Sequence, residues 1–167
     1  RYEAAKIGMR HFLEVFNSAA INLPIKEMGE YVNDCILKTL AGQINKEKPI
    51  FLKIQYNGPK AMDEIASYDP GNLIIGILGG KKGTSRDTFE LLIQAHKYGA
   101  RVALFGKKIN LSENQIFIVK TMRKVLEENI NSLEAVKFYH DQLTKNDISP
   151  DLNIDDDSII TDPSLKM

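Results

Sequence analysis

Residues 73–78 of this chain, Leu-Ile-Ile-Gly-Ile-Leu, form a continuous apolar run that leads directly into residues 79–83, Gly-Gly-Lys-Lys-Gly. Such a run is typical of a strand that is covered on both faces of a sheet. Three further apolar segments also predict short strands, and a segment with helical features follows each of the four. The four predicted strands span residues 10–17, 50–56, 73–78 and 101–105.

The segments after the predicted strands show helical spacing of apolar residues, or capping residues where a helix would begin. They predict helices over residues 24–42, 59–68, 84–98, 112–128 and 131–143. Ser112 with Gln115 and Asn131 with Glu134 are candidate capping boxes for the last two helices. The order β-α-β-α-β-α-β-α-α, with short connections, predicts an α/β fold with a parallel sheet. Two architectures satisfy it: an open doubly wound sheet, and half of a TIM-type (β/α)8 barrel.

The composition narrows the classes of partner. The chain holds 22 Lys+Arg and 22 Asp+Glu residues, a balance that gives no indication of nucleic acid or of an anionic membrane. No apolar stretch is long enough to span a membrane, and no signal peptide is recognisable. The single cysteine, Cys35, lies in an apolar helical segment. We therefore expect a buried thiol in a reducing compartment and a cytoplasmic protein.

Residues 146–167 differ in character from the rest, because aspartates cluster there with two prolines and little periodicity. We therefore expect residues 1–145 to form the β/α units and residues 146–167 to form an acidic, mostly irregular tail. The aspartates lack the spacing of a calcium loop, with its central glycine and final glutamate. The three histidines share no ligand spacing either, so no metal and no other cofactor is expected.

Lys53 stands in the middle of the apolar strand predicted at residues 50–56. An ammonium in such a place either gives up its proton more easily or finds a partner of opposite charge. A neutral lysine amine can attack a carbonyl, which is the first step of Schiff-base chemistry. The alternative is a lysine whose stem runs along apolar surface to water. Glu14, in the preceding predicted strand, could pair with Lys53 or move protons, or could be a surface carboxylate at a strand end.

Two glycine- and lysine-containing segments, residues 79–83 and 106–108, follow the last two predicted strands and precede helices. Backbone N–H groups beside lysines can hold an anion such as phosphate, although glycine also serves simply to turn the chain. Barrel enzymes frequently build a phosphate site from the loops after strands seven and eight. That numbering makes the four predicted strands five to eight of a barrel, with Glu14 on strand five and Lys53 on strand six. The abrupt start of the chain fits an absent N-terminal half.

Residues 53–60, Lys-Ile-Gln-Tyr-Asn-Gly-Pro-Lys, resemble the strand-six motif of archaeal-type class I fructose-bisphosphate aldolases and their deoxyribose-phosphate-aldolase-like relatives. Lys53 and Tyr56 hold the matching places, and Asn57 replaces the usual threonine. Residues 79–81 resemble the family's Ser-Gly-Gly phosphate loop of strand seven, with Leu78 in place of serine. Residues 105–109 resemble its Gly-Arg-Asn loop of strand eight, with two lysines in place of arginine and asparagine. The resemblance covers roughly residues 8 to 125.

The resemblance implies a class I aldolase-like lyase that acts on a phosphorylated sugar or a related ketone or aldehyde. Lys53 would form the imine, and Glu14 and Tyr56 would complete the catalytic set. The phosphate or another anionic end would be held by a second set of residues. These are Gly79, Gly80, Lys81, Gly106 and Lys107.

Two alternatives remain open. The first is a non-catalytic domain that binds a sugar phosphate, or serves as a structural barrel half in a larger assembly. The second is an open doubly wound nucleotide-binding domain, although no Gly-x-Gly-x-x-Gly fingerprint follows any predicted strand. A half-barrel would leave two strand edges and an interior face uncovered. We therefore expect either a homo-oligomer or an upstream barrel half as partner.

Overall fold

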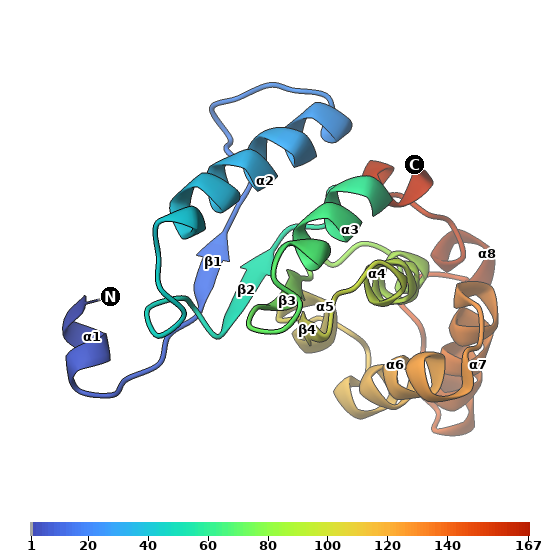
Figure 1. Cartoon of the computed structure of the whole chain (residues 1–167). Coiled ribbons are helices and arrows are strands. Elements are labelled where there is room, and N and C mark those ends of the chain that lie inside the picture. The colour runs from blue at the N-terminus through green and yellow to red at the C-terminus, as the bar shows by residue number, and fades with distance from the viewer. Residues whose placement is uncertain (1) are drawn as a thin grey trace. The chain divides into compact units, whose positions relative to one another are not determined.

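The computed structural model describes residues 2–167 (Figure 1). The described part of the chain forms four strands, eight α-helices and one 3-10 helix. The strands are β1 (Leu13–Val15), β2 (Phe51–Ile54), β3 (Ile74–Leu78) and β4 (Val102–Leu104). The helices are α1 (Tyr2–Lys6), α2 (Ile25–Ala41), α3 (Pro59–Tyr68), α4 (Ser85–Lys97), α5 (Lys107–Asn110), α6 (Gln115–Glu128), α7 (Ser132–Lys145), α8 (Ile154–Asp157) and the 3-10 helix η1 (Pro163–Lys166).

The chain divides into two compact units. The first unit holds the residues up to Leu78 together with Ala95–Leu104, and therefore the whole sheet. The second unit holds Gly79–Gln94 and Phe105–Met167. The expected tail, residues 146–167, includes α8 and η1 and belongs to the second unit.

The sheet of the first unit is entirely parallel, and its strands follow one another in chain order, β1-β2-β3-β4. This confirms the α/β fold with a parallel sheet. A doubly wound sheet has a point where the strand order reverses, and the strands described in residues 2–167 contain no such point. The sequential order is that of consecutive units of a β/α barrel.

The two faces of this sheet differ in their cover. Leu52 and Ile54 of β2 and Ile75 and Ile77 of β3 are buried on one face, where α2 and α3 pack against each other and α3 packs on β3 (Figure 1). On the other face, Ile74 at the start of β3 is exposed, Gly76 is buried and Leu78 is half-buried. The predicted cover on both faces of residues 73–78 is therefore incomplete at Ile74.

Several predicted boundaries hold, and others shift. Asn131 and Glu134 form the predicted capping box of α7. The predicted capping box at Ser112 is wrong, because Asn114 caps α6 and accepts hydrogen bonds from Ile116 N and Phe117 N. Ser112 instead donates to the backbone carbonyl of Ile109. The first strand, expected over residues 10–17, is limited to Leu13–Val15. Cys35, expected to be buried, is exposed.

The second unit has a core of its own. Buried side chains from α4, α6 and α7 pack together around Phe89 and Tyr139, whose rings meet edge to face at 6.3 Å. Leu165 of η1 is also buried, so the C-terminal residues contribute apolar contacts as well as charge. The four-residue helix α5 directly follows Gly106, in a segment where the sequence pattern predicts no helix.

Candidate functional site

Lys53 lies in the centre of β2 and points to the open face of the sheet. Its neighbours Leu52 and Ile54 are buried on the covered face, because successive side chains of a strand point to opposite faces. Lys53 is half-buried, so its ammonium is partly shielded from water. The strand thus carries apolar residues for packing on one side and one amine on the other.

Glu14 of β1 is the direct neighbour of Lys53 in the sheet register. Its Oε1 lies 2.7 Å from Lys53 Nζ, and the two side chains are 30% and 24% exposed. The predicted pairing of these residues is thereby observed. An ion pair with this much exposure contributes at most about 1 kcal/mol to stability, so the pair is not needed to hold the fold together. The carboxylate instead lies where it can take a proton from the amine or return one.

The residues on the other side of Lys53 approach the sheet closely. Gly76 of β3 is the register partner of Lys53 on the side away from Glu14, and it carries no side chain. A Cβ at that position would meet Leu52 O at 3.2 Å and Leu104 Cδ1 at 3.3 Å. Phe12 and Phe51 stack with ring centroids 4.8 Å apart and planes 3° apart. The amine therefore has a carboxylate on one side and a glycine on the other, and Phe51 of the same strand stacks on Phe12, which precedes β1.

Tyr56 and Asn57 follow β2 directly. Tyr56 is buried, like Leu52 and Ile54, and does not share the half-exposed state of Lys53. Asn57 is also buried, and its amide forms two reciprocal hydrogen bonds with the amide of Asn17, of 2.7 and 3.0 Å. Asn17 follows β1 closely, so this amide pair joins the chain beyond Glu14 to the chain beyond Lys53. The catalytic assignment of Tyr56 stays a prediction.

The predicted anion-binding residues all lie in the second unit. Gly80 and Lys81 are exposed, and Gly80 has the left-handed backbone conformation (φ +66°) that favours glycine. Gly79 is half-buried, and a Cβ there would lie 3.0 Å from the ring of Phe105. The loops after β3 and β4 are therefore side by side at Gly79 and Phe105.

The two lysines after β4 have different surroundings. Gly106 and Lys107 are exposed, whereas Lys108 is only 6% exposed. Lys108 Nζ donates to Lys82 O at 3.0 Å and to Thr88 Oγ1 at 3.4 Å. Burial lowers the pKa of Lys108, and the charges of Asp87 and Asp162 oppose that effect only in part. Of the two lysines, Lys107 alone is available to a ligand.

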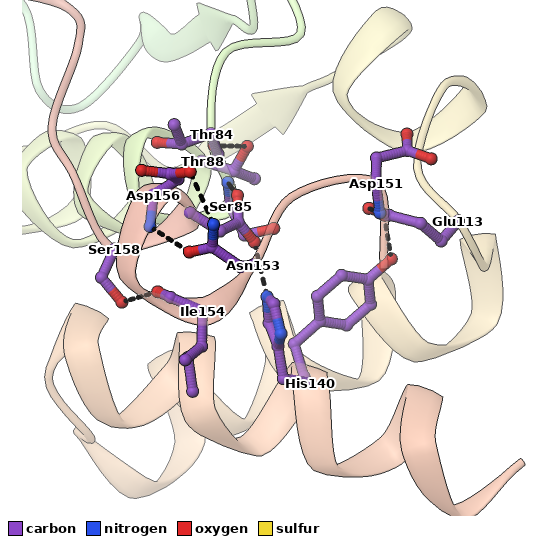
Figure 2. A network of polar contacts seen from close by, with 12 residues as sticks. Thr84, Ser85, Thr88, Glu113, His140, Asp151, Asn153, Ile154, Asp156 and Ser158 are labelled. Carbon is purple, nitrogen blue, oxygen red and sulfur yellow. Dashed lines mark hydrogen bonds and ion pairs between the residues drawn. The ribbon is translucent and has the colours of Figure 1, made fainter. Parts of the chain in front are cut away.

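Figure 2 shows Thr84 and Ser85, at the start of α4, within a network of polar contacts. The first turn of α4 is occupied by carboxylates of the protein itself. Thr84 and Asp87 form a reciprocal cap, with Asp87 N donating to Thr84 Oγ1 and Thr84 N to Asp87 Oδ2. Ser85 N donates to Asp157 Oδ1 at 2.7 Å, and His140 Nε2 to Asp157 Oδ2 at 2.9 Å. An anion bound after β3 would therefore rest on the glycine loop and not on this helix end.

Burial by itself would raise the pKa of Asp87, but hydrogen bonds outweigh it. The hydroxyl of Thr161 and the backbone N–H groups of Asp162, Thr161 and Thr84 hold the pKa of Asp87 below its ordinary value. The contacts from Thr161 and Asp162 join residues more than seventy positions apart in sequence, so nothing local in the sequence indicates them.

Within residues 2–167, no group of three or more His, Cys, Asp or Glu side chains is arranged to hold a metal ion. None of the helices described for the chain has the length and apolar character needed to cross a membrane.

Part of this chain is similar in sequence to a known protein. Over 113 residues the chain is 25% identical to 3-hydroxy-5-phosphonooxypentane-2,4-dione thiolase from Enterobacter sp. (strain 638). The relative is a thiolase. The match covers 68% of this chain and 38% of the thiolase, so the chain spans well under half the length of that relative. No family model matches the chain. The similarity supports a general relation to enzymes of the thiolase and aldolase type.

Proposed function

We propose that this chain carries the imine-forming lysine of a lyase that acts on a phosphorylated ketone or aldehyde. The observation that carries the proposal is the pair formed by Lys53 and Glu14, at 2.7 Å on the open face of a parallel sheet. A half-exposed amine can be reached by a carbonyl compound, and the adjacent carboxylate can accept a proton as the amine reacts.

The chemistry follows from the amine. Glu14 takes a proton from Lys53, and the neutral Nζ adds to the carbonyl carbon. Loss of water gives an imine, which in its protonated form accepts the electron pair of the bond between its α and β carbons as that bond breaks. Glu14 takes the proton of the β-hydroxyl in this step, and the β carbon leaves as an aldehyde. Protonation of the resulting enamine and hydrolysis of the imine restore the lysine. Glu14 carries protons in these steps as a general acid and base.

The phosphate is assigned to the glycine loop and the adjoining exposed residues of the second unit. Gly79, Gly80 and Gly106 offer backbone N–H groups, and Lys81 and Lys107 offer positive charge. The name of the thiolase relative describes a diketone that carries a phosphonooxy group. Its substrate thus combines the two chemical groups that the proposal assigns to this chain, a ketone and a phosphate ester.

The second candidate function is a non-catalytic sugar-phosphate-binding or structural barrel half. It is favoured by the contacts of Lys108, which the structure turns inward, and by the occupied first turn of α4. The amine of Lys108 and the backbone N–H of Ser85 are thus bonded within the protein and cannot serve an anion site. Binding of a sugar phosphate without imine formation would favour this candidate.

Reductive trapping tests the proposal. The full-length protein is incubated with dihydroxyacetone phosphate and borohydride, and the modified peptide is identified by mass spectrometry. We expect the added mass on Lys53 and its loss in Lys53→Met. Lys60→Met is the matched control. Lys60 lies in the same motif as Lys53, is exposed and forms an ion pair with Glu30 of α2. A label on another lysine, or turnover that survives Lys53→Met, would show the proposal to be wrong.

A further inference from the structure

The C-terminal residues 151–165, called the strap below, are joined to residues 82–88 by polar contacts (Figure 2). Lys82 Nζ donates to Asp151 Oδ2 at 2.6 Å, and Thr84 Oγ1 donates to the backbone carbonyl of Ile159 at 2.8 Å. The other contacts run through Asp157, which accepts from Ser85 N, and through Asp87, which accepts from the strap. The strap therefore meets the chain at the end of the loop after β3 and in the first turn of α4.

Two carboxylates carry the inner part of this contact, and both are deeply buried. Asp87 is 2% exposed and Asp157 is 4% exposed. A buried carboxylate is unfavourable unless hydrogen bonds satisfy it. The donors to Asp87 are Thr84 N, Thr161 N, Thr161 Oγ1 and Asp162 N, and the donors to Asp157 are Ser85 N and His140 Nε2. Such directional bonds set the position of individual backbone atoms, which apolar packing alone does not do.

The backbone atoms fixed in this way mark one end of the glycine loop, residues 79–83. Thr84 and Ser85 are held by the strap, and Lys82 O is held from the other side by the buried Lys108. Gly80 and Lys81, between these anchors and the end of β3, stay exposed. The loop is thus fixed at its base while the residues assigned to the ligand face solvent. A loop already held in its binding form loses less entropy when a ligand binds.

We propose that the strap positions the glycine loop for an anionic ligand, with Asp157 and Asp87 as positioning residues. This inference rests on the phosphate site of the proposed function. It adds that the C-terminal segment controls how tightly the phosphate is held.

Substitutions at Asp157 test the proposal. Asp157→Ala removes the acceptor of Ser85 N, whereas Asp157→Asn keeps an oxygen in that place. Asp155→Ala is the matched control, because Asp155 lies in the same short helix α8 and is exposed. Imine trapping on Lys53 is measured as a half-saturation concentration for dihydroxyacetone phosphate and, separately, for unphosphorylated dihydroxyacetone.

We expect Asp157→Ala to raise the half-saturation concentration for the phosphorylated ketone by about 10- to 100-fold. The value for dihydroxyacetone should not change, and Asp157→Asn should recover most of the loss. An equal loss for both ketones would indicate a general structural defect and would overturn the proposal, as would an unchanged preference in Asp157→Ala. If Asp157→Ala does not fold, Thr161→Val loosens the strap more gently, by removing one donor to Asp87.

Titration with inorganic phosphate, followed by phosphorus NMR, separates the strap from the imine chemistry. If the wild-type protein forms no imine but binds phosphate more tightly than Asp157→Ala, the proposed lyase function is wrong and the role of the strap stands. If the two proteins bind phosphate equally, the role of the strap is overturned whatever the trapping result.

Discussion

Glu14 and Lys53 lie directly opposite each other on neighbouring parallel strands, with 2.7 Å between the carboxylate oxygen and the amine nitrogen. The sheet register, set by backbone hydrogen bonds, brings their Cα atoms level, so the pair does not depend on a flexible loop. Catalytic groups on rigid elements are held more accurately than groups on loops.

Replacing Glu14 with glutamine should slow both imine formation and the later proton transfers. Glu14→Gln keeps the size of the side chain but cannot take a proton, so we expect turnover to fall by about 10²- to 10⁴-fold and borohydride to trap the imine on Lys53 more slowly. Stability should change by no more than about 1 kcal/mol. The control is Glu30→Gln, at the exposed pair with Lys60, which should leave turnover unchanged. Unchanged turnover in Glu14→Gln would exclude a proton-carrying role.

Gly29 allows α2 and α3 to approach each other closely. A Cβ at Gly29 would lie 2.8 Å from Ala61 Cβ and 3.0 Å from Asn57 Cβ. Gly29→Ala gains up to about 1 kcal/mol of helix propensity but should lose about 1–3 kcal/mol to overpacking. We expect a net loss in the free energy of unfolding, measured in urea. Gly42→Ala, whose added Cβ would meet nothing within 4 Å, should change it by less than about 0.5 kcal/mol. A Gly29→Ala protein as stable as wild type would contradict the close approach.

Asp87 should make the second unit sensitive to acid. Its pKa in the folded protein is lowered, so the stabilisation is present above the unfolded value of about 3.9 and is lost as the pH falls through the folded value. We expect Asp87→Asn to be less stable than wild type at neutral pH, by about 1.5–3 kcal/mol, and to lose less further stability on acidification. The measurement is the free energy of unfolding between about pH 6 and pH 2.

The acid response should be reduced and not abolished in Asp87→Asn. A hydrogen bond from Lys48 also lowers the pKa of Asp69 in the first unit, and that contribution remains in the variant. Asp155→Asn, at an exposed position, serves as the control. Parallel pH curves for wild type and Asp87→Asn would show that the hydrogen bonds to Asp87 do not lower its pKa.

The open face of the sheet should associate with another surface. Parallel sheets are ordinarily covered on both faces, yet Phe12, Phe16 and Ile74 are exposed in the first unit. We propose a second copy of the chain or an upstream barrel half as the cover. Sedimentation of residues 1–167 should show self-association that Phe16→Asp weakens and that Ile44→Asp, at an exposed residue after α2, leaves unchanged. A folded, monodisperse monomer would contradict this prediction.

Much of the fold was predictable because it is encoded locally. The apolar segments, the capping box of Asn131 and Glu134, and the alternation of strand and helix depend on neighbours within a few positions. The place of Lys53 within its strand was predictable for the same reason. Glu14 was a candidate partner, but its distance from Lys53 depends on strand register, which no single segment contains.

The remaining features depend on contacts between distant segments. Lys107 and Lys108 are adjacent and chemically identical, yet one is exposed and the other is buried against Lys82 and Thr88. The acidic composition of residues 146–167 predicted an irregular tail and gave no sign that Asp157 would bind Ser85. The N-cap of α6 is Asn114 and not the predicted Ser112. Ser112 follows the short helix α5 and donates its hydroxyl to the backbone carbonyl of Ile109.

The reciprocal amide pair of Asn17 and Asn57 has a consequence for the chemical lifetime of the protein. Asn57 precedes Gly58, and asparagine before glycine is prone to deamidation, because the glycine N–H can attack the side-chain carbonyl. Here the amide of Asn57 is buried and tied to Asn17 through both its oxygen and its nitrogen, which restrains it from the geometry of that attack. Substitution of Asn17 should therefore speed the deamidation of Asn57, four residues after Lys53.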